Sequence, residues 1–377
     1  MTRDFSARDF VLGIATGGAI VLALLSVGAL VFLRSCNPYS LGHWKLNIRT
    51  PFPSMWMNLG FWTTHDGKPI VHFNQATRAL LERIVDAAGL LVRDDDSRTP
   101  SPGHSATAPV AVLDLGFGCG DQTLALADML QAQYRSRFQY VGLSLDALQV
   151  QTAQRALDRR LRLDGAGESE SESESHGERA STRLTPASFK LFCADAARPE
   201  TWSGVIRASV DELAGRSFSQ QRWMLALDCL YHFSPSRRPA FRLAAGLLDA
   251  NLMAFDLLLG DEASRRDTFL VRLVSLVMNC PLRTFVTEAQ YRAQLVDCGY
   301  DEEGIEIREV SDHVFAGVSG YLARQEMALS QYGIGIGGFK LAGRLFEWFD
   351  RTRVVKAVIV VARTRRAGEG GEADGRE

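Results

Sequence analysis

The sequence has no excess of charge of either sign and no cluster of metal-binding side chains. Its 377 residues carry 42 Lys and Arg against 44 Asp and Glu, a net charge of −2. Without a basic excess there is no overall field that would favour nucleic acid, and we expect no such partner. The six cysteines are scattered along the chain: Cys36, Cys119, Cys193, Cys229, Cys280 and Cys298. Since there is neither a C-x-x-C pair nor a histidine cluster, we expect no metal, and reduced thiols in a domain that faces the cytosol.

A long hydrophobic run near the N-terminus departs from this average composition. Residues 10–33 form 24 consecutive uncharged residues. At about 1.5 Å per residue, such a helix would be roughly 36 Å long and could cross a hydrocarbon core of about 30 Å. A cleaved signal peptide would instead have an apolar region of about 7–15 residues and a small-x-small site. We therefore expect a retained transmembrane anchor over residues 10–33, preceded by a tail (1–9) and followed by a connector (34–55).

The basic residues beside this run predict its orientation. Arg3 and Arg8 precede it, whereas Arg34, Lys45 and Arg49 follow it. Because positive residues are retained on the cytoplasmic side, the slight excess after the run places the rest of the chain in the cytosol. We therefore expect the chain to be a single-pass membrane protein, and the endoplasmic reticulum is the default location.

Beyond the connector, strand-like apolar runs alternate with helical patterns. The strand-like runs cover residues 110–115, 138–145, 188–196, 222–230, 252–260, 304–312 and 354–363. This alternation predicts an α/β fold, a doubly wound and mostly parallel sheet with helices on both faces. We expect one domain over residues 56–363, with a helical cap at about 262–300. The acidic insertion 165–183 and the tail 364–377 are expected to be disordered, because they are too polar to build a core.

The first strand runs into a turn, VLDLGFGCGDQTL (112–124), in which Gly116, Gly118 and Gly120 alternate with other residues. A glycine-rich turn between a strand and a helix lets the backbone approach a nucleotide closely. The spacing differs from the dinucleotide fingerprint G-x-G-x-x-G, which disfavours a nicotinamide oxidoreductase, and no G-K-[ST] follows. The turn also has no Lys or Arg to bind phosphates. We therefore expect a nucleoside-like ligand without polyphosphate, and Asp114 suits a ligand with an ammonium group.

This turn resembles the signature motif of the class I S-adenosylmethionine-dependent methyltransferases, and later motifs extend the resemblance in order. It is similar in particular to the small-molecule branch that includes sterol, tocopherol and cyclopropane-type enzymes. The further matching motifs are MNLGFW (57–62), VGLSLDALQVQTAQ (141–154), FCADA (192–196), LALDCLYHF (225–233) and FVTEAQYRAQLVDCGY (285–300). The resemblance covers about residues 56–363 and implies a Rossmann-like sheet of seven strands, with S-adenosylmethionine as cofactor.

The resemblance also implies roles for individual residues. Asp114, with the backbone of the three glycines, would hold the methionine part of the cofactor. Asp195 would bind the adenine amino group beside Ala196, and Asp228 would face the methionine ammonium or the substrate. Ser144 stands where most class I enzymes have an acid that binds the ribose. Asp146 is an alternative ribose ligand, although a helix N-cap is its ordinary role.

Catalytic residues are sought just beyond the fourth strand. His232 lies past its carboxyl end, where crevices form in α/β sheets, and imidazole groups titrate near neutral pH. It is the candidate base, with a loop hydrogen bond as the alternative role. Tyr231 is a candidate to order the sulfonium or stack on the substrate, with packing as the alternative. Trp62 and Phe61 are expected to close over the cofactor or to pack in the core.

Apolar segments outside the sheet suggest the substrate class. Residues 332–351 alternate aromatic and basic side chains, which suits a helix at a membrane interface, a dimer contact or a pocket lid. Together with the anchor, this favours a small lipophilic acceptor: a sterol or other terpenoid, a quinone or phenol, or a lipid amine. The predicted function is a membrane-anchored methyltransferase. The alternative is a non-catalytic relative that binds the cofactor or a lipid as a scaffold.

Overall fold

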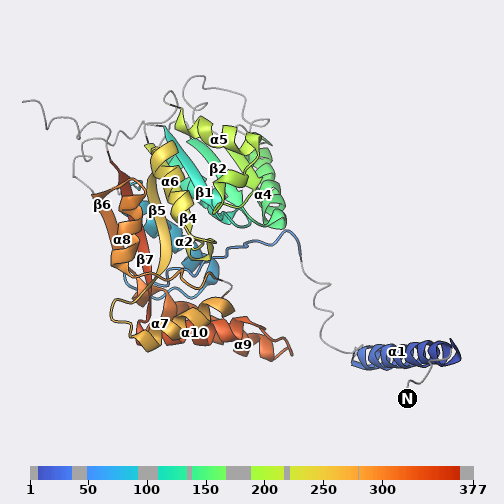
Figure 1. Cartoon of the computed structure of the whole chain (residues 1–377). Coiled ribbons are helices and arrows are strands. Elements are labelled where there is room, and N and C mark those ends of the chain that lie inside the picture. The colour runs from blue at the N-terminus through green and yellow to red at the C-terminus, as the bar shows by residue number, and fades with distance from the viewer. Residues whose placement is uncertain are drawn as a thin grey trace, which may run out of the picture. The chain divides into compact units, whose positions relative to one another are not determined.

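The computed structural model describes residues 7–35, 49–91, 109–133, 138–166, 188–215, 221–278 and 280–365, and Figure 1 shows the chain. Two compact units are present. The first comprises Met1–Pro53 with Leu329–Ile334, and the second Ser54–Ala328 with Gly335–Glu377. Residues 36–48, 167–187 and 366–377 lie outside the described residues. They include most of the expected connector (34–55), of the expected acidic insertion (165–183) and of the expected tail (364–377).

The first unit contains one long helix, α1 (Ala7–Ser35), which includes the whole run expected as an anchor. Its segment Phe10–Gly28 is long and apolar enough to cross a membrane, and the large apolar side chains of this segment are exposed. The hydroxyl groups within this segment bond to the helix itself. Thr16 Oγ1 donates to Leu12 O and Ser26 Oγ donates to Leu22 O, each at 2.7 Å.

The second unit is built on a seven-stranded sheet in the order β3-β2-β1-β4-β5-β7-β6. The strands are β1 (Val110–Leu115), β2 (Phe138–Ser144), β3 (Phe189–Cys193), β4 (Gln221–Leu227), β5 (Asn251–Leu259), β6 (Tyr300–Glu309) and β7 (Val355–Thr364). The first five pair in parallel, whereas β7 runs antiparallel to both β5 and β6. The predicted seven-stranded, mostly parallel α/β sheet is therefore confirmed.

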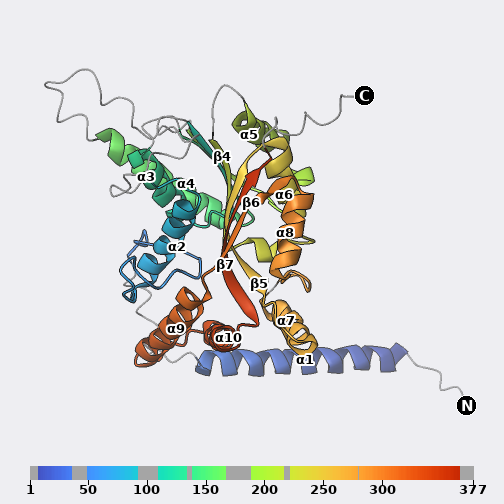
Figure 2. The ribbon, with the colours of Figure 1, turned by 90° about the vertical axis from the view of Figure 1, so that its left-hand side faces the viewer.

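Helices cover both faces of this sheet, as Figure 2 shows. On one face lie α2 (Phe73–Ala87), α3 (Asp121–Gln133) and α4 (Ala147–Ala166). On the other lie α5 (Gly204–Ala214), α6 (Arg238–Arg242) and α8 (Glu288–Asp297). A separate apolar core lies between the helices and each face of the sheet. The central strands are therefore buried on both sides, and their sequences are continuous apolar runs. Short helical turns connect the larger elements: η3 (Pro199–Thr201), η4 (Leu230–His232), η5 (Leu243–Leu247) and η6 (Ser311–His313).

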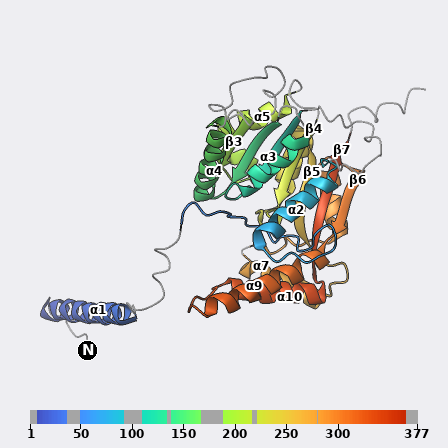
Figure 3. The ribbon, with the colours of Figure 1, turned by 180° about the vertical axis from the view of Figure 1, so that it is seen from behind.

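Three further helices gather at the end of the sheet where β5 ends, as Figures 1 and 3 show. They are α7 (Arg265–Val277), α9 (Phe315–Ser330) and α10 (Phe339–Thr352). The cap expected at about 262–300 is thus divided in the structure. Its first helix, α7, lies at this end, but its second, α8, packs on the face of the sheet against β5 and β6.

The apolar face of α10 is directed mainly into the protein. Phe346 and Phe349 are buried and pack with Phe315 of α9, with ring centroids 6.2 and 5.6 Å from that ring. Of the large apolar side chains over residues 332–351, Tyr332, Phe339 and Leu341 are strongly exposed, by 60%, 65% and 56%. Packing against α9 therefore accounts for Phe346 and Phe349, and the membrane, dimer or lid role expected for this segment stays a prediction.

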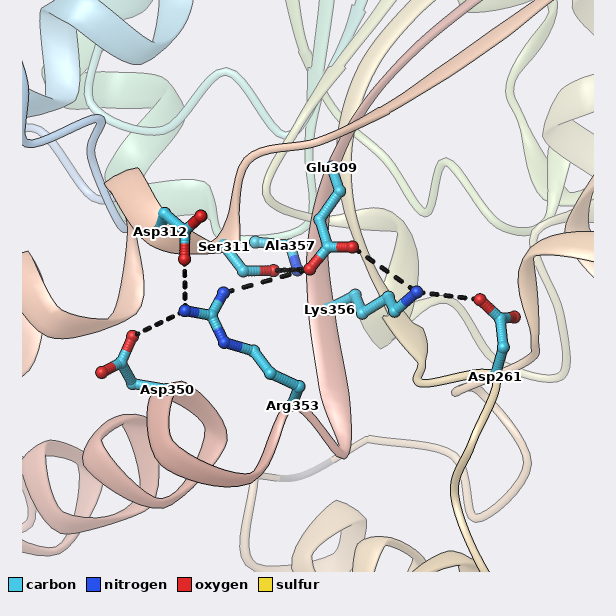
Figure 4. A network of polar contacts seen from close by, with 8 residues as sticks. All are labelled: Asp261, Glu309, Ser311, Asp312, Asp350, Arg353, Lys356 and Ala357. Carbon is cyan, nitrogen blue, oxygen red and sulfur yellow. Dashed lines mark hydrogen bonds and ion pairs between the residues drawn. The ribbon is translucent and has the colours of Figure 1, made fainter.

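Ion pairs join the end of α10 to the β6–β7 hairpin, as Figure 4 shows. Arg353 has a left-handed backbone (φ 53°) and contacts the carboxylates of Asp312 and Asp350. Glu309 of β6 pairs with Arg353 at 4.0 Å and with Lys356 of β7 at 3.4 Å. Because such exposed pairs contribute little stability individually, their main effect is to fix the direction in which α10 enters β7.

Candidate functional site

A pocket of about 560 Å³ opens at the carboxyl edge of the parallel strands. Its walls come from the turn after β1, the ends of β2, β3 and β4, and an extended N-terminal segment, Met55–Leu59. In open α/β sheets, ligands bind in the crevice at this edge, where the strand order changes direction. Here that change occurs between β1 and β4, and both strands contribute to the walls.

Asp114 lies behind the pocket wall. Its carboxylate is fully buried and accepts hydrogen bonds from Gln122 Nε2 (2.8 and 2.9 Å) and from the Tyr140 hydroxyl (2.7 Å). Burial raises its pKa to about 7, and the two hydrogen bonds oppose this shift. Gln122 lines the pocket, whereas Asp114 is outside its lining. The carboxylate thus orders Gln122 in the wall, and its expected contact with the methionine part of the cofactor stays a prediction.

The three glycines of the turn occupy different positions. All have positive φ, at 79°, 66° and 101° for Gly116, Gly118 and Gly120. Gly116 and Gly118 line the pocket, and a Cβ added at Gly118 would be 3.8 Å from Met57 Sδ. Gly120 lies outside the lining, and its added Cβ would be 2.9 Å from Ala153 Cα of α4. Gly120 therefore permits close packing of α3 on α4, and Gly116 permits close approach of Cys229, whose Cβ would be 3.0 Å from an added Cβ. Only Gly118 has space beside it on the pocket side.

The end of β2 presents polar groups to the pocket. Ser144 Oγ donates to Gln149 Oε1 at 2.7 Å, and both residues line the pocket. Asp146 also lines it, but one of its oxygens accepts from the backbone N–H groups of Leu148 (2.7 Å) and Gln149 (3.0 Å). This is the N-cap arrangement that satisfies the first amides of a helix. The amide of Gln149 was not identified from sequence as a pocket residue.

Asp195 and Ala196 line the pocket beyond the end of β3. Asp195 Oδ1 accepts a hydrogen bond of 2.9 Å from the Ala197 N–H, and its other oxygen is 3.7 Å from Arg198 Nε. Ala196 is buried and its small side chain leaves the wall flat at this point. The positions of both residues are compatible with contacts to a flat heterocyclic ring that carries an amino group.

Asp228 connects the end of β4 to the N-terminal segment. Oδ2 accepts from the Leu59 N–H and Oδ1 from the Tyr231 hydroxyl, each at 2.8 Å. Its φ of 61° is rare for a residue with a side chain, and such strain concentrates at functional sites. Burial raises the pKa of this carboxyl to about 7 despite both bonds. Asp228 itself borders the pocket.

Tyr231 and His232 both line the pocket in the turn after Asp228. Their ring centroids are 4.4 Å apart, and Tyr231 also stacks on Phe285 at 6.3 Å. His232 is exposed, and its Nδ1 is 3.3 Å from the Sγ of Cys280, the residue shortly after α7. The structure thus brings both candidate catalytic residues to the same wall as Asp228.

Trp62 and Phe61 are buried outside the pocket lining. Trp62 packs with Phe73 and Tyr321, and its Nε1 donates to Leu59 O at 2.8 Å. Phe61 stacks on His313 at 4.5 Å. Their observed contacts are those of core residues that anchor the end of segment 55–59.

The matched motif MNLGFW includes residues 57–59 of the pocket wall, but Met55 and Trp56 before it were not expected to line a pocket. The whole segment 55–59 lines the pocket as an extended stretch. It is fixed at both ends by carboxylates of the pocket. The Met55 N–H donates to Asp121 Oδ2 at 3.0 Å, and the Leu59 N–H donates to Asp228. Between them, Asn58 Nδ2 donates to Thr77 O at 3.2 Å and so attaches the segment to α2.

A buried ion pair supports the turn that carries Tyr231. Arg237 and Asp256 are in contact and both nearly inaccessible, and Arg237 also donates to the carbonyl and hydroxyl oxygens of Thr284. Thr284 Oγ1 in turn donates to the Tyr231 carbonyl at 2.6 Å. No sequence motif marked this arrangement, because its members come from distant elements. Among the described residues, no group of three or more His, Cys, Asp or Glu side chains is placed to hold a metal ion.

Comparisons with known proteins identify the fold. No protein-family model matches the chain, and no curated protein matches it in sequence. Solved structures do match. A geranyl diphosphate methyltransferase in complex with S-adenosylmethionine covers 82% of this chain and 98% of its own, with 10% identity and a TM-score of 0.50. The geranyl diphosphate C-methyltransferase from Streptomyces coelicolor A3(2), with Mg²⁺, geranyl diphosphate and S-adenosylhomocysteine, covers 88% and 99%, with 12% identity and a TM-score of 0.50. The second unit of this chain therefore has the fold of the class I S-adenosylmethionine-dependent methyltransferases.

Proposed function

We propose that the chain is an S-adenosylmethionine-dependent methyltransferase that acts on a small lipophilic acceptor. The observation that carries this proposal is the pocket where Gly116, Gly118, Asp195 and Asp228 meet at the carboxyl edge of a sheet with this fold. Its glycine turn has no Lys or Arg, which suits a nucleoside without polyphosphate.

The polar residues of the pocket suit the parts of the proposed cofactor. Gly118 leaves the turn without a side chain on the side that faces Met57. Asp228 would bind the ammonium group, Asp195 with Ala196 would hold the adenine, and Ser144 with Gln149 would meet the ribose hydroxyls. Asp114 supports the wall through Gln122.

The cofactor supplies a methyl group already activated by a sulfonium, so the protein has chiefly to align the acceptor and exclude water. Alignment alone can lower a barrier by about 7–11 kcal/mol in favourable cases. Tyr231 and His232 form the wall next to Asp228 and would contact the acceptor there. His232 would remove a proton where the acceptor atom loses one.

A lipophilic acceptor and a membrane anchor are supported by the first unit of the chain. Residues 10–33 lie within α1, whose Phe10–Gly28 segment has the length and composition of a membrane span. The side-chain hydroxyl groups of this segment bond to the helix's own carbonyls, which lowers the cost of placing them in hydrocarbon. A sterol or other terpenoid, a quinone or phenol, or a lipid amine would partition into the same membrane, for which the endoplasmic reticulum with a cytosolic pocket is the proposed location. The two structures compared above are those of geranyl diphosphate methyltransferases, whose substrate also has an apolar chain.

Two measurements on the detergent-purified full chain test this function. Calorimetric titration should show binding of S-adenosylmethionine and of S-adenosylhomocysteine, and no comparable binding of NAD⁺. Labelled methyl donor supplied with a total lipid extract should then yield a labelled lipid, identified by mass spectrometry. Binding without transfer would assign the chain to cofactor-binding scaffolds, and no binding by a folded protein would refute the proposal.

A further inference from the structure

Helix α7 has two faces, one buried and one exposed. Val271 and Ser275 are buried against the protein, with the Ser275 hydroxyl donating to Val271 O at 2.9 Å. The exposed side carries four large apolar side chains, Phe269 (60% exposed), Leu270 (37%), Leu273 (47%) and Leu276 (60%). Phe269, Leu273 and Leu276 follow an i, i+4, i+7 spacing and therefore form one stripe along the helix.

Single exposed apolar residues are common, but a contiguous stripe indicates an interaction surface. The helix that carries this stripe does not fray at its N-terminus, because α7 begins with a capping box. Ser264 Oγ accepts from the Asp267 N–H at 3.2 Å, and Asp267 Oδ2 accepts from the Ser264 N–H at 3.1 Å. The helix therefore presents a preformed apolar face.

The charges of α7 indicate what that face contacts. Arg265, Arg266 and Arg272 are all exposed, and at 100° per residue they fall on the same side as the stripe. The one acidic residue of the helix, Asp267, points to a different side and is occupied by the capping box. Arginines beside a Phe/Leu stripe are typical of a helix lying in the headgroup region of an anionic bilayer.

The rest of the chain brings a bilayer within reach of this face. Residues 36–53, which join α1 to the second unit, could extend over at most about 60 Å. If α1 spans a membrane, the second unit is thus confined to its vicinity, where even a weak surface affinity is effective. The C-terminal end of α7 leads to Cys280, which contacts His232 in the pocket wall. The stripe and the pocket therefore share one edge of the sheet.

We propose that the exposed face of α7 is a docking surface for an anionic lipid bilayer, with its apolar stripe among the acyl chains and its arginines at the phosphates. Docking in this way would place the His232 side of the pocket next to the membrane, so that an apolar acceptor could pass between them with little exposure to water. The surface is proposed on its own evidence, and it stands whether or not the pocket transfers methyl groups.

The test uses the full chain in vesicles of phosphatidylcholine and phosphatidylserine whose acyl chains carry bromine, which quenches nearby tryptophan. A Leu273→Trp variant places a probe in the stripe. A Leu163→Trp variant is the matched control, since Leu163 is also an exposed leucine (66%) but lies in α4. We compare the fluorescence that each added tryptophan contributes beyond that of the wild-type chain. We expect strong quenching of this contribution for the tryptophan at position 273 and little for the one at position 163.

Charge variants distinguish docking on an anionic bilayer from contact with another protein surface. Arg266→Glu with Arg272→Glu should abolish most of the quenching at position 273, whereas Arg155→Glu with Arg159→Glu, on exposed α4 positions, should leave it unchanged. Vesicles of phosphatidylcholine alone should also reduce it. Equal quenching at both positions, or none at 273, would overturn the proposal. The emission at position 273 could instead shift to the blue as the protein concentration rises, without quenching. That result would also overturn the proposal, and it would assign the stripe to contact with a second copy of the chain.

Discussion

The Leu59 N–H donates a hydrogen bond of 2.8 Å to the Asp228 carboxylate, although the two residues are 169 positions apart in the chain. This bond joins the N-terminal wall of the pocket to the end of β4. The same carboxylate is the proposed site for the ammonium group of the cofactor, so closure of the wall and ligand binding depend on one side chain.

Asp228→Asn should weaken binding of S-adenosylmethionine by about ten- to a hundredfold, because a hydrogen bond to a charged group is worth about 1.5–3 kcal/mol. Asparagine keeps an oxygen for the Leu59 N–H and removes only the charge.

The pKa of Asp228 also predicts a pH dependence of cofactor binding. Since this pKa is about 7, the affinity of the wild type should rise between roughly pH 6 and 8 as the carboxyl ionises, and the variant should lack this rise. Calorimetry at several pH values measures both. 5′-Methylthioadenosine, which has no ammonium group, is the control and should bind independently of pH in this range.

The same shift predicts a pH effect on stability. The pKa of Asp228 is raised from 3.8 to about 7, so the folded protein holds a proton that the unfolded chain has already lost. This carboxyl therefore lowers the free energy of unfolding progressively as pH rises from about 4 to 7 and adds no further change above that. Asp228→Asn should become more stable relative to wild type across this window. Denaturant unfolding at pH 4.5 and pH 7.5 checks it, and an unchanged difference between the two proteins would contradict the assigned pKa.

The glycine turn offers a test that separates packing from ligand approach. Gly120→Ala would bring a Cβ to 2.9 Å from Ala153 Cα at a φ of 101°, so it should lower the free energy of unfolding by about 1–3 kcal/mol or more. Gly118→Ala meets nothing closer than Met57 Sδ at 3.8 Å, and only its φ of 66° costs stability, by about 1–2 kcal/mol. Gly118→Val should in addition weaken cofactor binding through the volume it occupies. Equal binding by Gly118→Val and wild type would exclude Gly118 from the site.

The strands of the sheet were predicted well because each buried strand is a run of apolar residues. VAVLDL over residues 110–115 is β1 without a shift in its bounds, since all six residues are buried. The antiparallel placement of β7 could not be derived from its composition, because VKAVIVVART is equally apolar in either direction. It depends on antiparallel pairing with β5 and β6, and α9 and α10 lie between β6 and β7 in the chain.

The site was predicted less completely than the fold, for reasons that particular residues make clear. Motif positions placed Gly118, Asp195 and Asp228 at the pocket, because each follows a strand end. The same reasoning could not show that Gln122 stands between Asp114 and the pocket, since this depends on the direction of one side chain. Nor could it identify Met55 and Trp56, because this part of the extended segment lies outside the matched motif and reaches the pocket through tertiary contacts alone.

The buried pair Arg237–Asp256 should behave as a positioning element for the Tyr231 turn. Arg237→Met leaves Asp256 buried without its partner, and breaking such a pair typically costs about 3–5 kcal/mol. The double variant Arg237→Met with Asp256→Leu should recover much of this stability, because it removes both charges. It should not recover activity fully, since Thr284, which donates to the Tyr231 carbonyl, remains without the guanidinium. Chemical unfolding and acceptor KM, measured on the same preparations, distinguish the two effects. Full recovery of both would show that the pair acts on stability alone.

The contact between Cys280 and His232 leads to a final prediction about catalysis. Burial raises the pKa of the Cys280 thiol to about 12, so the thiol stays protonated, and its sulfur lies 3.4 Å from the Met278 carbonyl oxygen, which can accept that hydrogen. The sulfur can then accept a hydrogen bond from His232 Nδ1–H, a tautomer in which Nε2 is the basic nitrogen.

His232→Gln should therefore lower kcat by about 10²-fold or more for an acceptor that loses a proton, because general bases contribute about 10²–10⁴-fold. The Kd for S-adenosylmethionine should stay the same, as measured by calorimetry. Cys280→Ala should have a smaller effect on kcat and shift its pH profile, since it removes only the partner that selects the tautomer. Cys193→Ala, at an exposed cysteine outside the pocket lining, is the matched control and should change neither. If His232→Gln retained wild-type kcat while binding the donor normally, His232 would be a loop residue and the base would have to be sought elsewhere in the wall.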